Sequence, residues 1–221
     1  MTHGSAKRER TKVVLFGATG TVGSRIATEA SARGHLVLAV SRSGQSPIPG
    51  VAAAAGDASD PAAVAVLARG ADAIASACVP PRDATDPREP FLALNEGLVA
   101  GAREAGVGRL VVVGGAGGLE VAPGQALAEQ PGFPEGFLPE ADAHRDVLAF
   151  YRSVDDLDWT YVSPAPEIAP GERTGRFRTG GDALLTDAEG HSRISIEDYA
   201  VAFVDELERD AHPHARMSVA Y

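Results

Sequence analysis

Apolar residues along the chain fall into short runs that alternate with amphipathic stretches. Residues 12–16 form the first apolar run, and Val22, Ile26 and Ala30 then recur at every fourth position with polar residues between them. The first pattern is typical of a buried strand and the second of a helix that packs on one face. A glycine-rich turn separates the two patterns, so this stretch predicts a strand, a tight turn and a helix.

The same alternation continues to residue 220. Further strands are predicted at 36–40, 51–55, 72–78, 109–113, 159–162, 194–196 and 216–220, and helices at 61–69, 91–105, 140–154 and 197–208. Strands that alternate with helices predict an α/β fold, a Rossmann-type doubly wound parallel sheet in a single domain. We expect residues 1–11 to be a flexible tail, residues 12–221 to form the domain, and 176–178 with 183–186 to make a small antiparallel excursion.

The turn after the first strand carries three glycines spaced three residues apart: Gly17, Gly20 and Gly23. In a dinucleotide-binding unit the first makes the turn, the second lets the backbone approach a pyrophosphate, and the third lets helix and strand pack closely. Free N–H groups at the helix start then face the phosphates, and Thr19 and Thr21 add hydroxyl donors. The turn predicts a nucleotide site; the alternative is a plain tight turn without a ligand.

The end of the second strand indicates which dinucleotide is bound. An NAD site carries an acidic residue there for the ribose 2′-hydroxyl, but this chain has Ser41, Arg42 and Ser43. A guanidinium flanked by hydroxyls suits a 2′-phosphate, so NADP(H) is expected rather than NAD(H). The alternative is that Arg42 is a solvated loop charge. Asp57, after the third strand, is expected either to meet the adenine amino group or to cap the next helix.

Composition narrows the possible partners. The chain has 221 residues, a net charge of −10 and one cysteine, Cys78. The negative charge argues against nucleic acid or an anionic membrane as partner, no apolar run approaches membrane-spanning length, and residues 1–10 lack the apolar core of a secretory signal. We expect a soluble cytoplasmic protein, a monomer or homodimer, that acts on a small molecule. No metal site is expected, because His212 and His214 lack a ligand cluster beside them.

Several segments together resemble the atypical short-chain dehydrogenase/reductases, a group that includes NmrA-like proteins, NADH-flavin reductase-like proteins and biliverdin reductase B. The matching segments are 17–23, 56–57, 112–117, 157–164 and 194–200. The resemblance implies a Rossmann fold with NAD(P) across the carboxyl edge of the sheet. It also implies that the nicotinamide lies near Gly114 and Gly115, with its amide against the turn 164–168.

The motif, the strand ends and this resemblance together define the residues expected at the cofactor. They are Gly17, Thr19, Gly20, Thr21, Val22, Gly23, Ser41, Arg42, Ser43, Asp57, Ala58, Ala77, Cys78, Gly114, Gly115, Pro164, Ala165, Pro166 and Ile168.

The usual proton relay of the superfamily is missing. Its Tyr-x-x-x-Lys pair needs a lysine in the second half of the chain, but the lysines are Lys7 and Lys12, and residues 114–118 offer no hydroxyl. His144 is the candidate proton donor, because imidazole titrates near neutral pH; the alternative is a surface helix histidine. Tyr151, two turns further along the same helix, is expected in the core.

Three functions remain open on this sequence. The first is an NADP(H)-dependent oxidoreductase that passes hydride directly to a conjugated acceptor such as a flavin or quinone. The others are a non-catalytic NADP(H)-binding regulator and an epimerase or dehydratase. Loops at 79–90, 115–139 and 164–168 are expected to wall the acceptor pocket, since ligands of open α/β sheets bind at the carboxyl ends of the strands.

Overall fold

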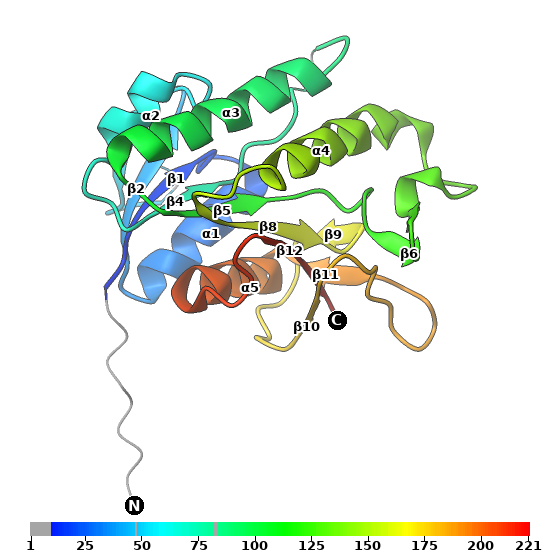
Figure 1. Ribbon diagram of the computed structural model, residues 1–221. Coiled ribbons are helices and arrows are strands. Elements are labelled where there is room, and N and C mark those ends of the chain that lie inside the picture. The colour runs from blue at the N-terminus through cyan, green and yellow to red at the C-terminus, as the bar shows by residue number, and fades with distance from the viewer. Residues whose placement is uncertain (1–9, 47, 82–83) are drawn as a thin grey trace, which may run out of the picture.

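A mostly parallel sheet forms the middle layer of the protein (Figure 1). The computed structural model describes residues 10–46, 48–81 and 84–221, so the predicted tail lies mainly outside the described residues. Within these ranges the sheet has eight strands, and only β10 runs antiparallel to its neighbour. In spatial order they are β3 (Ala52–Ala55), β2 (Leu36–Ser41), β1 (Lys12–Phe16), β4 (Ala73–Ser76), β5 (Arg109–Val113), β8 (Asp158–Pro164), β12 (Ala215–Ala220) and β10 (Arg178–Gly180).

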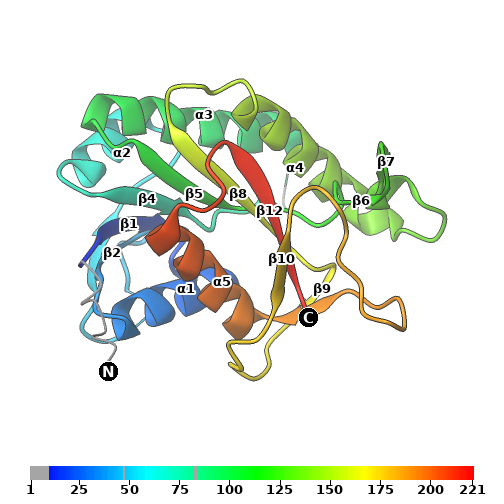
Figure 2. The same ribbon diagram turned by 60° about the horizontal axis from the view of Figure 1, so that its bottom comes forward.

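Helices cover both faces of the sheet, as the predicted doubly wound fold requires. The helices α1 (Thr21–Ala32) and α5 (Ile196–Arg209) lie on one face, and α2 (Pro61–Ala68), α3 (Arg88–Ala105) and α4 (Leu138–Tyr151) lie on the other (Figures 1 and 2). Alternate residues of β1 enter the two cores: Val13 and Leu15 face α1 and α5, whereas Val14 and Phe16 face the other layer. Burial on both faces explains why the strands read as continuous apolar runs.

The helices pack through one apolar face each. In α3 the buried positions include Phe91, Asn95, Leu98 and Ala102, which follow the helical period, while Arg103 projects outward to an ion pair with Asp156. Across the described ranges, no helix combines the length and the apolar character that crossing a membrane requires.

The start of α2 corrects one expectation for Asp57. The capping residue is Asp60, whose Oδ1 accepts hydrogen bonds from the N–H groups of Ala62 (3.0 Å) and Ala63 (3.3 Å). Asp57 instead accepts from the backbone N–H and hydroxyl of Ser59. The alternative that Asp57 caps α2 is therefore wrong. Its carboxylate accepts its hydrogen bonds within the loop before the helix.

Of the short strands outside the main sheet, the sequence predicted only the one at 194–196. The expected excursion of 176–178 with 183–186 is wrong, because β10 pairs with β12 instead and Ala183 forms a bridge with Glu120. Two further strand pairs lie outside the main sheet. β9 (Glu167–Ala169) pairs with β11 (Arg193–Ser195), and β6 (Glu120–Ala122) forms a hairpin with β7 (Gln125–Ala126). These partners are distant in sequence or only a few residues long, so periodicity gives no signal for them.

Residues 170–177, which we call the strap, cross the amino end of α5. The Asp198 carboxylate accepts hydrogen bonds from the hydroxyl of Thr174 and the N–H of Gly175, the latter at 2.7 Å, and Glu197 accepts from the N–H of Gly171 at 2.8 Å. Asp198 is fully buried. The acidic pair at the helix start therefore fixes the strap, in addition to its expected favourable place at the positive end of the helix dipole.

The Asp60 cap supplies a test of how α2 is stabilised. Asp60→Ala removes an acceptor for two N–H groups at the helix start, so the free energy of unfolding should fall by about 1 kcal/mol. Asp60→Asn keeps an acceptor oxygen and is the matched control. Urea unfolding of the three proteins measures the effect; equal stability of Asp60→Ala and the wild type would contradict the cap.

Candidate functional site

The carboxyl ends of β1, β2, β4, β5 and β8 meet at one edge of the sheet because these strands are parallel. The strand order changes direction at β1, which has β2 on one side and β4 on the other. In open α/β sheets, ligands bind in the crevice at this switch point. The predicted site residues follow strands that end at this edge.

The glycine turn after β1 has no room for a side chain at Gly17 or at Gly23. Gly17 has a left-handed φ of 73°, and a Cβ on it would lie 2.6 Å from the carbonyl carbon of Ala77 at the end of β4. A Cβ on Gly23 would lie 2.2 Å from the carbonyl oxygen of Gly17. The first glycine thus allows the turn and its approach to β4, while the third lets α1 pack against the turn.

The first turn of α1 is open to a ligand. Its capping residue, Gly20, has no side chain to bond the first N–H groups, and no acidic residue lies in the first turn. Thr19, Gly20 and Thr21 are exposed, and Val22 is half-buried. The first N–H groups of a helix have no intrahelical partner and carry the positive end of the dipole, so the turn fits a phosphate.

The ends of β2, β3 and β4 bring three predicted residues together. Hydrogen bonds from Ser59 lower the pKa of the Asp57 carboxyl, and the Arg42 guanidinium lowers it further. Burial raises the pKa of the Cys78 thiol. The negative charge of Asp57 adds a smaller increase to this pKa, and the positive charge of Arg42 a smaller decrease. Arg42, Asp57 and Cys78 therefore influence one another electrostatically, and Arg42 is exposed enough to meet a ligand.

Ser41 and Ser43 differ in what their hydroxyls do. The Ser41 side chain is buried, and its oxygen accepts a hydrogen bond from the Gln45 N–H at 3.2 Å. Ser43 is exposed. Of the two hydroxyls that flank Arg42 in the sequence, that of Ser41 shapes the turn and that of Ser43 is the accessible one.

Other predicted positions can offer only backbone or apolar contacts. Ala58, Ala77 and Ala165 are buried, so their methyl groups face the protein interior. Pro164 ends β8, Pro166 is exposed, and Ile168 lies in β9 opposite Ile194 of β11. The turn 164–168 is thereby anchored at both ends beside the edge of the sheet.

Beyond β5 the chain lies flat against two aromatic rings. A Cβ on Gly114 would lie 2.3 Å from Cε1 of Tyr161, and one on Gly115 would lie 2.7 Å from the imidazole ring of His144. The Gly114 N–H donates to the Val162 carbonyl at 2.7 Å. Residues 114 and 115 thus form a floor without side chains, which we call the glycine floor.

His144 lies beneath the glycine floor and is buried. Its Nδ1 is 2.6 Å from the Tyr161 hydroxyl, and its ring meets Phe91 edge-on at 4.9 Å. Burial lowers its pKa to about 4. Both the surface alternative and the expected neutral-range pKa are therefore wrong: His144 is uncharged at pH 7 and has no imidazolium proton to give. Tyr151 is buried, as expected, and donates to Asn95.

Sequence reasoning missed the role that Ser163 can play. Its hydroxyl is buried and is without a hydrogen-bond partner among the described residues. Gly114 borders it, since a Cβ there would lie 3.1 Å from the Ser163 oxygen. An unpaired buried hydroxyl costs free energy, and a polar group of a ligand can repay it. Its place near the carboxyl end of β8, next to the turn 164–168, was the available signal.

The histidines His212 and His214 do not form a metal clip. His212 Nδ1 lies 2.7 Å from Glu206, whereas His214 Nε2 lies 3.4 Å from Asp158. Each imidazole thus faces a different carboxylate.

Comparison with known proteins identifies the family. A model of the family described as NAD(P)H-binding matches residues 17–207. The chain therefore belongs to this NAD(P)H-binding family, as the resemblance implied, and its Rossmann-like fold is confirmed.

Solved structures agree over nearly the whole chain. A Burkholderia pseudomallei protein titled "putative exported protein" is 51% identical, with a TM-score of 0.88 and coverage of 96% of this chain and 100% of that one. A "putative epimerase" from Bacteroides thetaiotaomicron is 37% identical, with a TM-score of 0.88 and coverage of 96% and 98%. A "putative NADH-flavin reductase" from Streptococcus pneumoniae is 32% identical, with a TM-score of 0.79 and coverage of 95% and 99%.

The depressed pKa of His144 predicts a pH dependence of stability. Below about pH 6.5 the unfolded chain binds a proton at this residue, whereas the folded protein does so only near pH 4. As the pH is lowered across this window, the free energy of unfolding should therefore fall by about 1.4 kcal/mol per pH unit. His144→Gln lacks this contribution, so its stability relative to the wild type should improve as the pH falls.

Urea unfolding between pH 4 and pH 7 measures this difference. His191→Gln is the control, because His191 is exposed in a loop, and it should keep the wild-type slope. Parallel pH profiles of His144→Gln and the wild type would contradict the buried neutral imidazole.

Proposed function

We propose that the protein is an NADP(H)-dependent oxidoreductase that transfers hydride to a conjugated acceptor such as a flavin or quinone. One observation carries the proposal: the same sheet edge combines an uncapped α1 with a glycine floor beyond β5. The first suits a pyrophosphate, and the second brings backbone without side chains to the edge where open α/β sheets bind their ligands. Membership of the NAD(P)H-binding family and the Streptococcus pneumoniae neighbour support it.

Each end of the dinucleotide has assigned partners on this chain. The glycine turn and the first N–H groups of α1 hold the pyrophosphate, Arg42 and Ser43 the 2′-phosphate, and Asp57 the adenine amino group. The glycine floor and the turn 164–168 hold the nicotinamide, where the Ser163 hydroxyl is available to its carboxamide. When bound, the dinucleotide supplies hydride to the acceptor.

The protein contributes orientation rather than a proton relay. The chain has no lysine after Lys12, so a Tyr-x-x-x-Lys pair is impossible, and His144 is uncharged. An acceptor that stabilises its own negative charge after hydride transfer can take its proton from water, and positioning alone then lowers the barrier. Residues 115–139 and 164–168 line the acceptor pocket. The third segment expected to line it, 79–90, includes residues 82 and 83, which lie outside the described ranges.

A redox-neutral reaction is the second candidate. The Bacteroides thetaiotaomicron neighbour titled "putative epimerase" favours it, at 37% identity. An epimerase of this kind would return the hydride within one catalytic cycle, so product would form without net loss of NADPH. Net oxidation of NADPH by flavin or quinone separates the two candidates.

The proposal includes a setting as well as a reaction. A small-molecule substrate fits the sheet-edge site, and a single cysteine fits a reducing, cytoplasmic compartment. The Burkholderia pseudomallei neighbour is described as a "putative exported protein". Cell fractionation is therefore the measurement that tests the cytoplasmic location. Sedimentation would distinguish the monomer from the homodimer.

A binding titration tests the proposal first. Protein stripped of cofactor is titrated with NADPH and with NADH, and nicotinamide fluorescence is followed. We expect both to bind and NADPH to bind more tightly, because Arg42 can meet the 2′-phosphate. Oxidation of bound NADPH by flavins and quinones is then measured. Failure to bind either dinucleotide would contradict the proposed function.

Arg42 accounts for the expected preference. Arg42→Ala should weaken NADPH binding by about 1.5 to 3 kcal/mol, as for loss of a charge-assisted hydrogen bond, with little change for NADH. Arg69→Ala removes an exposed arginine after α2 and is the control. Equal losses for both dinucleotides in the Arg42→Ala titration would sink the assignment.

A further inference from the structure

One face of α1 is turned away from the sheet. Thr21, Ser24, Arg25 and Thr28 follow the helical spacing of three and four residues that places side chains on one face. Ser24, Arg25 and Thr28 of this face border a cavity of about 330 Å³. Ile48 of the loop after β2 and Glu197 of α5 also line it. The cavity therefore lies beside the helix whose first turn is open to a phosphate.

Hydrogen bonds connect Arg25 to that first turn. A guanidinium nitrogen of Arg25 lies 3.3 Å from the Ser24 hydroxyl, which donates in turn to the Thr21 carbonyl at 3.1 Å. Helical side chains lean toward the amino end of their helix. The positive charge of Arg25 thus lies one hydroxyl away from Thr21, the first residue of α1.

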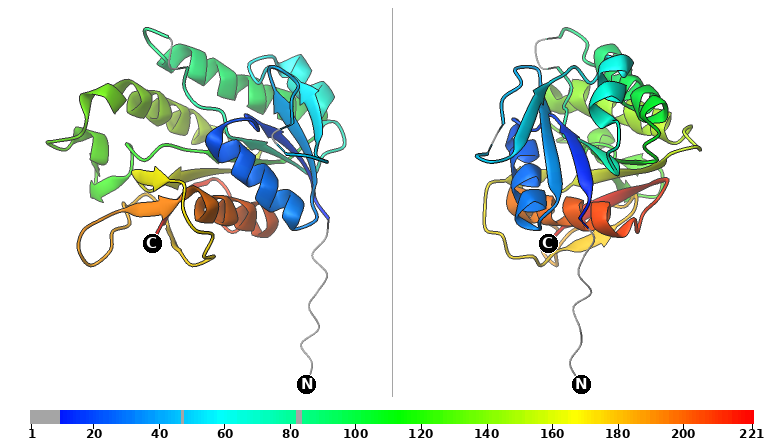
Figure 3. Two further views of the ribbon diagram at one scale, coloured as in Figure 1. Left: turned by 180° about the vertical axis from the view of Figure 1, so that it is seen from behind. Right: turned by 90° about the vertical axis from the view of Figure 1, so that its left-hand side faces the viewer.

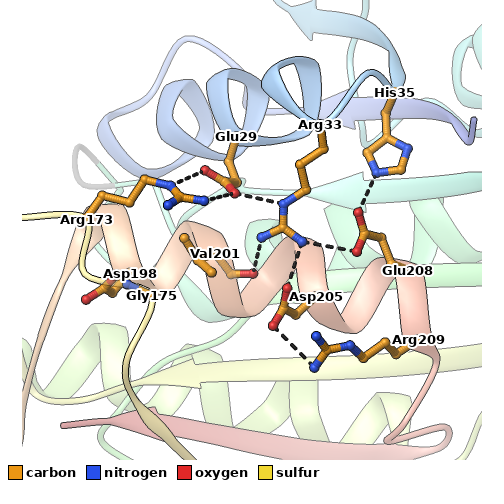
Figure 4. Close-up of polar contacts among 10 residues, drawn as sticks. All are labelled: Glu29, Arg33, His35, Arg173, Gly175, Asp198, Val201, Asp205, Glu208 and Arg209. Carbon is orange, nitrogen blue, oxygen red and sulfur yellow. Dashed lines mark hydrogen bonds and ion pairs between the residues drawn. The ribbon is translucent and has the colours of Figure 1, made fainter. Parts of the chain in front are cut away.

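Arg25 is held more loosely than the arginines around it. Its Nε lies 3.4 Å from Glu197, and its side chain is 40% exposed. By comparison, Arg33 and Arg173 each lie 2.7 Å from Glu29 (Figure 4). A charge-assisted hydrogen bond normally spans about 2.7–2.9 Å. Arg25 therefore has a weak partner and an accessible guanidinium.

Arg25 is only one of several groups that stabilise the Glu197 carboxylate. Its other carboxylate oxygen accepts from the Gly171 N–H of the strap at 2.8 Å. Glu197 also lies in the first turn of α5, where the helix dipole favours negative charge. The carboxylate therefore keeps favourable partners when Arg25 moves away.

We propose that Arg25 leaves Glu197 and binds a pyrophosphate oxygen when the dinucleotide binds. The contact is common to NADPH and NADH, unlike the contact proposed for Arg42. This inference rests on the dinucleotide binding of the proposed function, and not on hydride transfer. The pyrophosphate is a stronger competitor for Arg25 than Glu197 is. The N–H groups of α1 bind the pyrophosphate as well, in addition to the charge of Arg25.

Binding measurements on Arg25→Gln test the inference. Kd for both NADPH and NADH should rise about 10-fold, as expected when one charge-assisted hydrogen bond is lost. ADP, which carries the pyrophosphate without nicotinamide, should weaken equally in a competition assay. The difference from the wild type should shrink in high salt, which screens accessible charges. Thermal unfolding of the free protein checks that the variant folds.

Two further variants sharpen the test. Arg173→Gln makes the same charge change in the same cavity, but Arg173 is paired with Glu29, so Kd should stay within about twofold of the wild type. Glu197→Gln keeps an acceptor for Gly171 and removes the competing charge, so Kd should fall about threefold.

Three outcomes overturn the inference. They are wild-type affinity in Arg25→Gln, a loss confined to NADPH, and equal losses in Arg25→Gln and Arg173→Gln. If the wild type binds dinucleotide and Arg25→Gln binds as well, this inference fails alone. If the wild type binds neither dinucleotide, the proposed function fails with it.

Discussion

The close approach of three backbone segments at the start of α1 determines the rest of the molecule. Gly23 packs over the carbonyl of Gly17, and Gly17 packs against Ala77. One added carbon at either glycine would separate α1 from β1 or β1 from β4. This contact sets where α1 begins, how it lies beside α5 (Figure 3), and which N–H groups face the sheet edge.

A second close approach defines the other end of the edge. The glycine floor rests on Tyr161 and His144, whose burial keeps the imidazole uncharged. The two ends of the edge therefore present mainly backbone, and the charges of Arg42 and Asp57 lie at the ends of β2 and β3. A surface of this kind is suited to recognition by shape and by aligned peptide dipoles, which need no reorganisation on binding.

Sequence patterns predicted what depends on neighbours in the chain. The strand bounds 12–16 and 109–113 agree with β1 and β5, because apolar runs between turns are local signals. The pairing of β10 with β12 was missed, since its partners are about forty residues apart. The pKa of His144 was also out of reach, because α3 and β8 supply the Phe91 and Tyr161 rings that bury it.

The buried carboxylate of Asp198 joins parts of the chain that are separate in sequence. It is satisfied by the strap before it in sequence and by the hydroxyl of Tyr221 after it, without an ion pair among the described residues. Loss of any one of these donors would leave part of a buried charge without a hydrogen bond, which costs more free energy than the bond itself contributes. The strap, the start of α5 and the chain after β12 therefore hold one another in place through a single buried carboxylate.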